Sequence, residues 1–243
     1  MKGLKGDYMI YVLVVCEESQ TVCKAFRDRG YIAFSADILS PSGGLPEYHI
    51  KGDALPLLNG FCTFRTMDNK QHYIEKWDLI IAHPPCTYLT VTGNRWFNID
   101  KYGEKAIERF SKREEAAKFF KAISNANCRF IAIENPVGYM NTHFRKPEQI
   151  IQPYMFGEPF EKKTCLWLKG LPPLEPTNKV KPEPRTYFKS GKSMPKWYAD
   201  LWGKTPAERS KLRSKTFEGI AIAMAEQWGD YVENYCQLNN PML

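Results

Sequence analysis

Two short apolar runs, each ending in a rigid turn with one reactive side chain, constrain this sequence most strongly. The first spans 78–86, reads DLIIAHPPC and ends at Cys86. The second spans 130–136, reads FIAIENP and carries Glu134. Such short apolar runs indicate buried strands, and an open α/β sheet builds its site at the carboxyl ends of its strands. The pair predicts a thiol and a carboxylate at one edge of a sheet.

Strand-like and helix-like segments alternate along the chain. We expect strands at 8–15, 31–36 and 129–133, and helices at 18–29, 101–126 and 216–231, where apolar residues recur at helical spacing. This alternation predicts an α/β fold, a parallel sheet with helices on both faces. We expect a catalytic α/β domain over 1–170, completed by a C-terminal helix within 213–243, and a small basic lobe over 171–212.

The predicted lobe is rich in proline and lysine. Six prolines between 171 and 196 oppose regular helices and strands, so we expect an irregular lobe, with a disordered linker as the alternative. From 162 to 215 there are fourteen Lys and Arg against four acids, a net charge of +10, interleaved with aromatic residues. That composition favours contact with a polyanion such as nucleic acid; a solvated basic loop is the alternative.

Composition excludes several classes of protein. The chain has no apolar run long enough to span a membrane, and residues 1–6 lack the apolar core of a signal peptide. Seven cysteines form no framework spacing, and four lie in or beside apolar strand-like runs, which favours reduced thiols and a cytoplasmic location. Without a CxxC pair or clustered histidines, no metal site is expected.

The two turns resemble those of the cytosine-C5 DNA methyltransferases, most closely the small phage-type members. That family places its catalytic cysteine in a Pro-Pro-Cys turn, matched here by Pro84, Pro85 and Cys86. Its Glu-Asn-Val turn is matched by Glu134 and Asn135, with proline in place of valine. The strand and helix over 12–30 correspond to its cofactor-binding start, and 217–221 is similar to its final motif. The resemblance covers roughly 1–170 and 213–232.

The resemblance implies a Rossmann-like methyltransferase sheet that binds S-adenosyl-L-methionine (SAM), with DNA as partner. It implies Asp37 at the ribose hydroxyls and Asp53 at the adenine; both are also ordinary turn or cap residues. The implied cofactor-binding residues are Cys16, Glu17, Glu18, Ser19, Asp37, Ile38, Asp53, Ala54 and Pro84. The implied substrate-binding residues are Pro85, Thr87, Arg95 and Asn135. The implied setting is a bacterial or phage-infected cell, where such proteins protect a genome from restriction.

Three features depart from the family. The first loop, 16–21, reads CEESQT where the family is rich in glycine, and glycine lets backbone approach a ligand closely. The family's Gln-x-Arg-x-Arg segment, which orients the glutamate, is replaced by KKTC at 162–165, so Lys163 is the expected substitute and the third catalytic residue. The recognition region is also shorter than usual.

The implied chemistry gives each side chain a role. Cys86 attacks C6 of cytosine as a thiolate, which makes C5 able to accept a methyl group; His83 is expected to lower the thiol pKa. Glu134 protonates N3, and we expect burial to raise its pKa. A base in duplex DNA must be flipped out to reach them. Residues 87–95 are expected to close over it, with Arg95, Trp96 and Phe97 contacting the gap or simply packing.

Other functions fit the same residues. The short recognition region favours RNA or a free cytosine nucleotide as the substrate. Glu17 and Glu18 in place of glycines leave room for a different alkyl donor. A catalytically inactive nucleic-acid-binding protein with this fold is a third interpretation, which the retained Cys86 and Glu134 oppose. The target sequence and the oligomeric state have no signal in the sequence.

Overall fold

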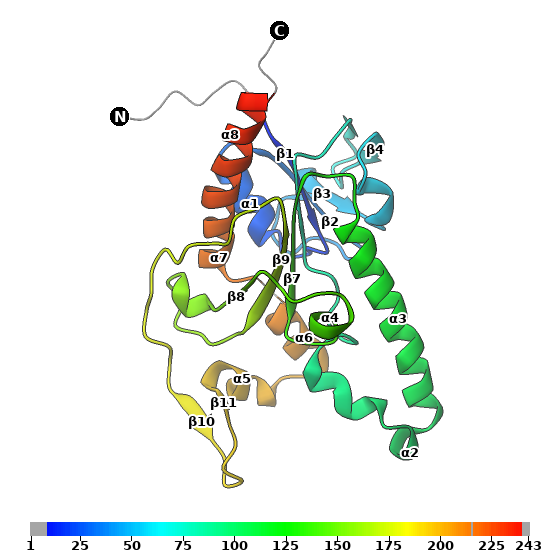
Figure 1. Cartoon of the computed structure of the whole chain (residues 1–243), viewed down its shortest axis with the longest axis vertical. Helices are drawn as coiled ribbons and strands as arrows, with labels where there is room; N and C mark the ends of the chain where they lie inside the picture. The colour runs from blue at the N-terminus through cyan, green and yellow to red at the C-terminus, as the bar shows by residue number, and fades with distance from the viewer. Residues whose placement is uncertain (1–8, 215, 240–243) are drawn as a thin grey trace.

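The computed structural model of the chain describes residues 9–214 and 216–239 (Figure 1). Several expectations therefore lie outside the described residues. They are the absence of a leader at 1–6, the first residue of the strand expected at 8–15, Lys215 of the basic segment, and the end of the C-terminal segment at 240–243. Within the described ranges, no helix combines the length and apolar character needed to cross a bilayer.

A seven-stranded sheet forms the centre of the molecule. Its spatial order is β3 (His49–Lys51), β2 (Ile32–Asp37), β1 (Tyr11–Val15), β6 (Leu79–Ala82), β7 (Phe130–Pro136), β9 (Thr164–Lys169) and β8 (Gln149–Ile151). The first five are parallel, and β9 runs antiparallel to both of its neighbours. The expected α/β fold with a mostly parallel sheet is confirmed, although β8 and β9 were not expected.

Helices cover both faces of the sheet, as predicted. Alternate residues of β1 point to opposite faces, so Val12 and Val14 join one core cluster and Leu13 and Val15 the other. The first cluster is closed by α1 (Thr21–Asp28), α7 (Glu218–Ala223) and α8 (Gly229–Asn239). The second is closed by α3 (Glu104–Ser124), which lies across the sheet from α8 (Figure 1).

The helix boundaries differ from the predicted ones where backbone geometry changes. The helix expected at 101–126 is split at Gly103, whose φ of 51° separates α2 (Ile99–Tyr102) from α3. The helix expected at 216–231 begins as α7, passes through a π turn at Met224–Trp228 and continues as α8 to Asn239. That register change places Trp228 in the core.

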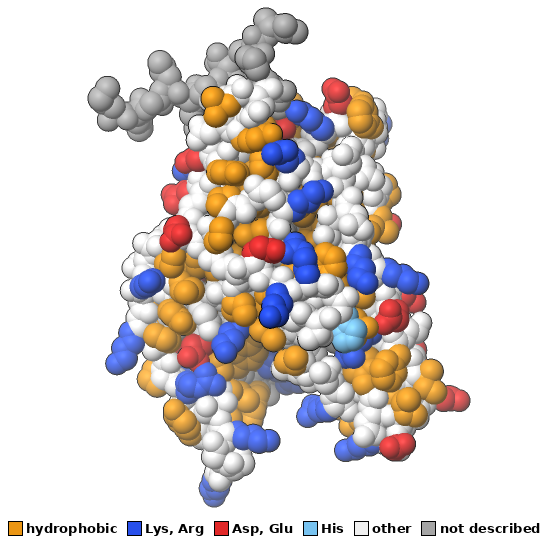
Figure 2. Space-filling view, viewed as in Figure 1, with side chains coloured by type: hydrophobic (Ala, Val, Ile, Leu, Met, Phe, Trp, Pro, Cys, Tyr) orange, Lys and Arg blue, Asp and Glu red, His pale blue; other side chains and the backbone are white. Residues whose placement is uncertain are grey.

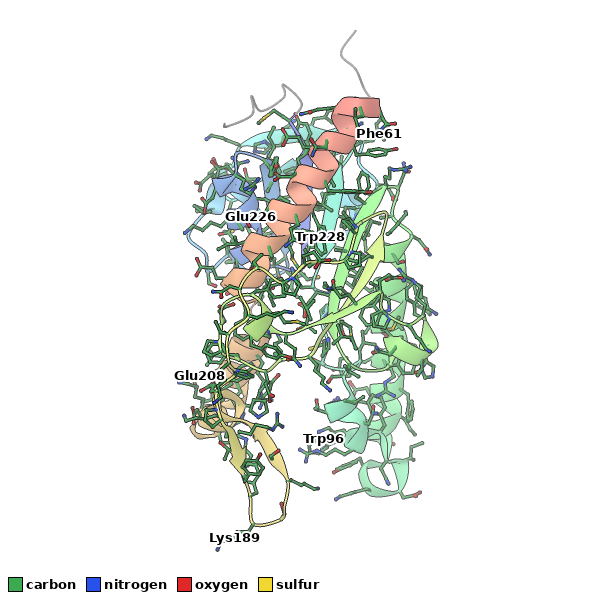
Figure 3. All side chains as sticks on the ribbon, turned by 60° about the vertical axis from the view of Figure 1, so that its left-hand side comes forward. Phe61, Trp96, Lys189, Glu208, Glu226 and Trp228 are labelled. Atoms are coloured by element: carbon green, nitrogen blue, oxygen red, sulfur yellow. The ribbon has the colours of Figure 1, made fainter. Side chains whose placement is uncertain are left out.

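The basic lobe contains regular elements, so the expectation that prolines exclude them was wrong. β10 (Arg185–Tyr187) and β11 (Ser193–Pro195) form an antiparallel hairpin, followed by α5 (Lys196–Asp200), a 3-10 turn (Leu201–Gly203) and α6 (Pro206–Ser214). Proline is tolerated because it lies at the end of a two-stranded edge. Figure 3 shows this hairpin projecting from the molecule, with Lys189 at its tip.

A residue outside the lobe holds the start of α7. The Glu158 carboxylate accepts the backbone N–H of Glu218 at 3.3 Å and of Gly219 at 3.2 Å. A Cβ added at Gly219 would lie 1.9 Å from the carbonyl oxygen of Phe156, so only glycine fits this contact. The start of α7 is therefore held against the segment that precedes β9.

The remaining elements are short. They are η1 (Pro46–Tyr48), η2 (Leu55–Leu57), the hairpin of β4 (Cys62–Arg65) and β5 (Gln71–Ile74), η3 (Val91–Phe97), α4 (Met140–His143) and η4 (Pro153–Met155). η3 and α2 form an arm that extends below the sheet beside the basic lobe (Figures 1 and 3).

Candidate functional site

The chain path puts a crevice at the carboxyl ends of the central strands. From β1 the chain moves outward to β2 and β3, and it resumes on the other side of β1 with β6. Such a reversal opens a crevice where ligands bind, and a cleft of about 2110 Å³ lies there. The predicted site residues all line it: Cys16, Glu17, Glu18, Ser19, Asp37, Ile38, Asp53, Ala54, Pro84, Pro85, Cys86, Thr87, Arg95, Glu134, Asn135 and Lys163.

Cys86 and Glu134 come from adjacent parallel strands. Ala82 of β6 pairs with Ile133 of β7, so the turn that carries Cys86 starts beside Glu134, which lies within β7. The side-chain amide of Asn135 donates to the carbonyl of Pro84 at 2.7 Å and ties the turns together. Asn135 was expected to bind substrate; it is buried at the edge of the cleft, and its amide holds the turn that presents Cys86.

The thiol of Cys86 is not activated in the way the sequence suggested. Burial and the negative charge of Glu134 raise its pKa, while the charge of Lys162 acts in the opposite direction. His83 was expected to lower this pKa, but its Nδ1 lies 2.9 Å from Oε2 of Glu134 instead.

Glu134 is buried, yet its pKa lies below the ordinary value. Burial alone raises this pKa, as expected, but the charge of Lys162 and the hydrogen bond and charge of His83 outweigh it. The prediction of a raised pKa was therefore wrong. The cation that acts on Glu134 is Lys162 and not the expected Lys163, although both line the cleft.

The first loop, 16–21, has left-handed backbone angles at two residues that are not glycine. Cys16 has φ of 59° and Gln20 has φ of 57°, a region that costs ordinary residues energy. The buried Gln20 side chain offsets part of that cost, because it donates to the carbonyl of Leu45 at 2.8 Å and accepts its N–H at 3.0 Å. The loop is thus fixed by a side chain where glycines were expected.

Glu17 occupies the amino end of α1. Its buried carboxylate accepts the N–H of Val22 at 2.5 Å and of Cys23 at 3.0 Å. It therefore satisfies donors that would otherwise attract an anionic ligand. Burial raises the Glu17 pKa to about 7, against the opposing effects of His83 and the two N–H groups.

Asp37, the last residue of β2, and Asp53, which follows β3, each accept a hydrogen bond within their own turn and also line the cleft. Oδ1 of Asp37 accepts the N–H of Leu39 at 2.9 Å, and Oδ1 of Asp53 accepts that of Leu55 at 3.0 Å. Burial, followed by these two acids, raises the Cys16 pKa to about 12, so that thiol stays neutral. Ile38 beside them is 74% exposed, an apolar surface suited to an aromatic ring.

Basic side chains surround the other half of the cleft. They are Lys105, Arg109 and Lys112 of α3, Lys162 and Lys163 before β9, and Arg209 and Arg213 of α6. The space-filling view shows a hollow between the two lower projections of the molecule, with Lys and Arg gathered around it (Figure 2). Glu108 and Glu161 also line the cleft, but these cations outnumber them, so one cleft has an acidic end and a mainly basic end.

Trp96 and Phe97, which were expected either to contact the gap in the base stack or to pack, differ in their surroundings. Phe97 is buried against Phe110, with ring centroids 5.0 Å apart, so it packs. Trp96 lines the cleft, and the Arg95 guanidinium lies over the Trp96 ring, with its central carbon 4.6 Å from the ring centroid. In Figure 3, Trp96 lies on one arm and Glu208 on the arm opposite.

Sequence reasoning missed four residues of the site. Tyr198 and Arg213 come from the lobe region, Lys162 precedes it, and Thr216 follows it. Burial and the charges of Cys86 and Glu134 raise the Tyr198 pKa, although Arg213 opposes them. Only the basic and aromatic composition of 162–215 signalled this segment, and composition does not say which side chains reach the strand ends.

Comparison with known proteins adds no assignment. No protein-family model matches the sequence, and no curated protein matches it at a significant level.

Proposed function

We propose that the protein is a SAM-dependent DNA (cytosine-5-)-methyltransferase that works through a covalent adduct to Cys86. One observation carries the proposal. A thiol and a carboxylate stand at the ends of adjacent parallel strands, in one cleft, with their turns joined by the bond from Asn135 to Pro84. A nucleophile beside an acid is what addition to a cytosine ring needs.

The acidic end of the cleft fits a cationic cofactor. Glu17, Glu18, Asp37 and Asp53 line it, and Glu17 fills the helix terminus where a phosphate would bind. SAM has a sulfonium and an ammonium but no phosphate, and the exposed Ile38 offers its adenine an apolar surface. The strand order, with its switch point between β1 and β6, supports assigning the sheet to the Rossmann-like methyltransferase type.

The protein's own side chains divide the remaining work. Cys86 sulfur bonds to C6 of cytosine while Glu134 delivers a proton to N3, which leaves C5 nucleophilic. SAM, when bound, supplies the methyl group as an electrophile. Loss of the C5 proton to a base and cleavage of the C6–S bond then return Cys86 to the thiolate, and the N3 proton returns to Glu134. Glu134 is ionised in the free protein, so it takes up its proton as cytosine docks.

The basic end of the cleft fits a polyanion. Its lysines and arginines come from both arms, so a strand between the arms would contact cations on either side. A cytosine in a duplex would have to leave the base stack to reach Cys86. DNA in the cytoplasm of a bacterial or phage-infected cell is therefore the proposed substrate.

Transfer of labelled methyl from SAM tests the proposal. Duplex DNA, single-stranded DNA, RNA and free dCMP are each incubated with the wild type, with Cys86→Ala and with Cys62→Ala, a buried cysteine of β4 outside the cleft. We expect label in DNA with the wild type and with Cys62→Ala, and none with Cys86→Ala. Label that persists in Cys86→Ala would refute the covalent mechanism.

The same assay separates the alternatives. Label confined to RNA or dCMP would keep the chemistry and change the substrate. No label in any substrate would overturn the proposal, and a calorimetric titration with SAM would then distinguish a different alkyl donor from a protein that only binds nucleic acid.

A further inference from the structure

His83 stands between the two ends of the cleft. It follows β6, which lies between β1 and β7 in the sheet, and its backbone N–H donates to the carbonyl of Val15 at 2.9 Å. Its imidazole is therefore near Glu17 after β1 and Glu134 in β7; the charge of His83 acts on both carboxyls. The side chain is only 8% exposed.

The two ring nitrogens of His83 differ in their hydrogen bonding. Nδ1 lies 2.9 Å from Oε2 of Glu134, and the carboxyl is itself only 9% exposed. An ionised carboxylate only accepts hydrogen bonds, so Nδ1 carries the proton of this contact. The Thr216 hydroxyl is 3.5 Å from Nδ1, too far to replace the carboxylate. Nε2 is buried, and no described residue partners it.

A buried imidazole–carboxylate pair is a poor way to stabilise a fold. Removing both groups from water costs about as much as their attraction returns, and the unpartnered Nε2 adds a further cost. The pair nevertheless lines the cleft beside Cys86. The placement of the pair in the cleft indicates that its role is to fix the geometry of the Glu134 carboxyl.

We propose that His83 is a positioning residue: its Nδ1–H holds Oε2 of Glu134, so that Oε1 is the oxygen that presents a proton to the cytosine ring. This inference rests on the proposed methyl transfer to cytosine. The titratable groups that face the pair are Lys162, Cys86, Tyr198 and Cys165, which interact with Glu134, and Glu17 on the β1 side. His83 acts through Glu134 and takes no part in bonding to substrate.

Two variants separate positioning from general damage to the fold. His83→Asn keeps an N–H donor close to the position of Nδ1, whereas His83→Leu keeps the volume and loses the donor. We expect His83→Leu to lower kcat on the order of 100-fold with little change in KM, because a displaced acid costs rate more than binding. His83→Asn should recover most of that loss.

The pH profile of kcat gives a readout that a purely structural role would not move. The reaction needs the Cys86 thiol ionised and the Glu134 carboxyl protonated, so Cys86 and Glu134 together hold one proton. The fall of kcat at low pH, its acidic limb, therefore follows mainly the pKa of Glu134. Loss of the Nδ1–H donor raises the Glu134 pKa. The acidic limb of the kcat profile should therefore move to higher pH in His83→Leu and return to its wild-type position in His83→Asn. An unmoved limb in His83→Leu would overturn the proposal.

Histidine-selective ¹⁵N NMR tests the contact without turnover. We expect a protonated Nδ1 on His83 in the wild type between pH 6 and 8, with its resonance shifted in Glu134→Gln and absent in His83→Asn. An unprotonated Nδ1 would refute the inference even if methyl transfer is found. Conversely, a protonated Nδ1 without any methyl transfer would remove the proposed function and leave the contact as described.

Discussion

The buried Glu17 predicts an unusual dependence of stability on pH. Burial raises its pKa in the folded protein from 4.5 to about 7. The folded state therefore holds this proton more tightly than the unfolded state does, and the stability it contributes is complete below pH 4.5 and lost as the pH rises through 7. At about 1.4 kcal/mol per pH unit, the full loss is roughly 3 kcal/mol.

Glu17→Gln should remove this dependence. The amide can still accept one N–H of α1, and the loss of the other bond lowers stability equally at every pH. Between pH 5.5 and 8, the wild type should therefore lose roughly 2 kcal/mol of unfolding free energy relative to Glu17→Gln, on the same linkage argument.

Urea unfolding followed by tryptophan fluorescence measures this difference at several pH values in the absence of ligands. Glu18→Gln, at the neighbouring half-buried position, controls for removing one negative charge from the loop. A difference between wild type and Glu17→Gln that stays constant from pH 5.5 to 8 would show that the Glu17 pKa is not raised, and the argument from burial would fail.

Three further predictions follow from close contacts and charges. Gly219→Ala places a Cβ 1.9 Å from a backbone carbonyl and should lower the unfolding free energy by about 1–3 kcal/mol; Gly203→Ala, which meets nothing within 4 Å, is its control in thermal unfolding. Lys162→Met should reduce methyl transfer about tenfold or more, because its charge acts on both reactive groups, whereas Lys163→Met should have a smaller effect; equal losses would contradict this. Arg213→Ala should weaken DNA binding and reduce the salt slope by about 0.9 if its guanidinium contacts one phosphate; an unchanged slope in a salt titration would place the DNA elsewhere.

The parts of the fold that the sequence predicted depend on local pattern. The apolar runs before Cys86 and Glu134 are strands whose residues are buried on both faces. The turn with Cys86 follows β6 as predicted, but Glu134 and Asn135 lie inside β7 and not in a turn, because β9 extends the pairing to Pro136. The split of one expected helix at Gly103 needed the backbone angle, which the amphipathic pattern does not carry.

The parts that were missed depend on contacts between distant segments. His83 and Glu134 are 51 residues apart, and nothing in either run states that the imidazole faces the carboxylate. Whether Lys162 or Lys163 acts on Glu134 depends on the path into β9, an antiparallel strand that was not expected. A pKa is likewise the net effect of burial and neighbouring charges, and the sequence indicated only the burial of Glu134.

The bonds from Glu158 to the first N–H groups of α7 have a consequence for how such a protein can change. Glu158 precedes β9, whereas the lobe leaves the central sheet after β9 and returns to it at α7, so these bonds hold the start of α7 through a residue outside the lobe. Between β9 and α7 the described chain adds no strand to the central sheet, because β10 and β11 form a separate two-stranded sheet. A change in length at the tip of the β10–β11 hairpin therefore leaves the register of the central sheet untouched. Under the proposed function, the surface that meets DNA can vary at this tip while Cys86 and Glu134 keep their positions.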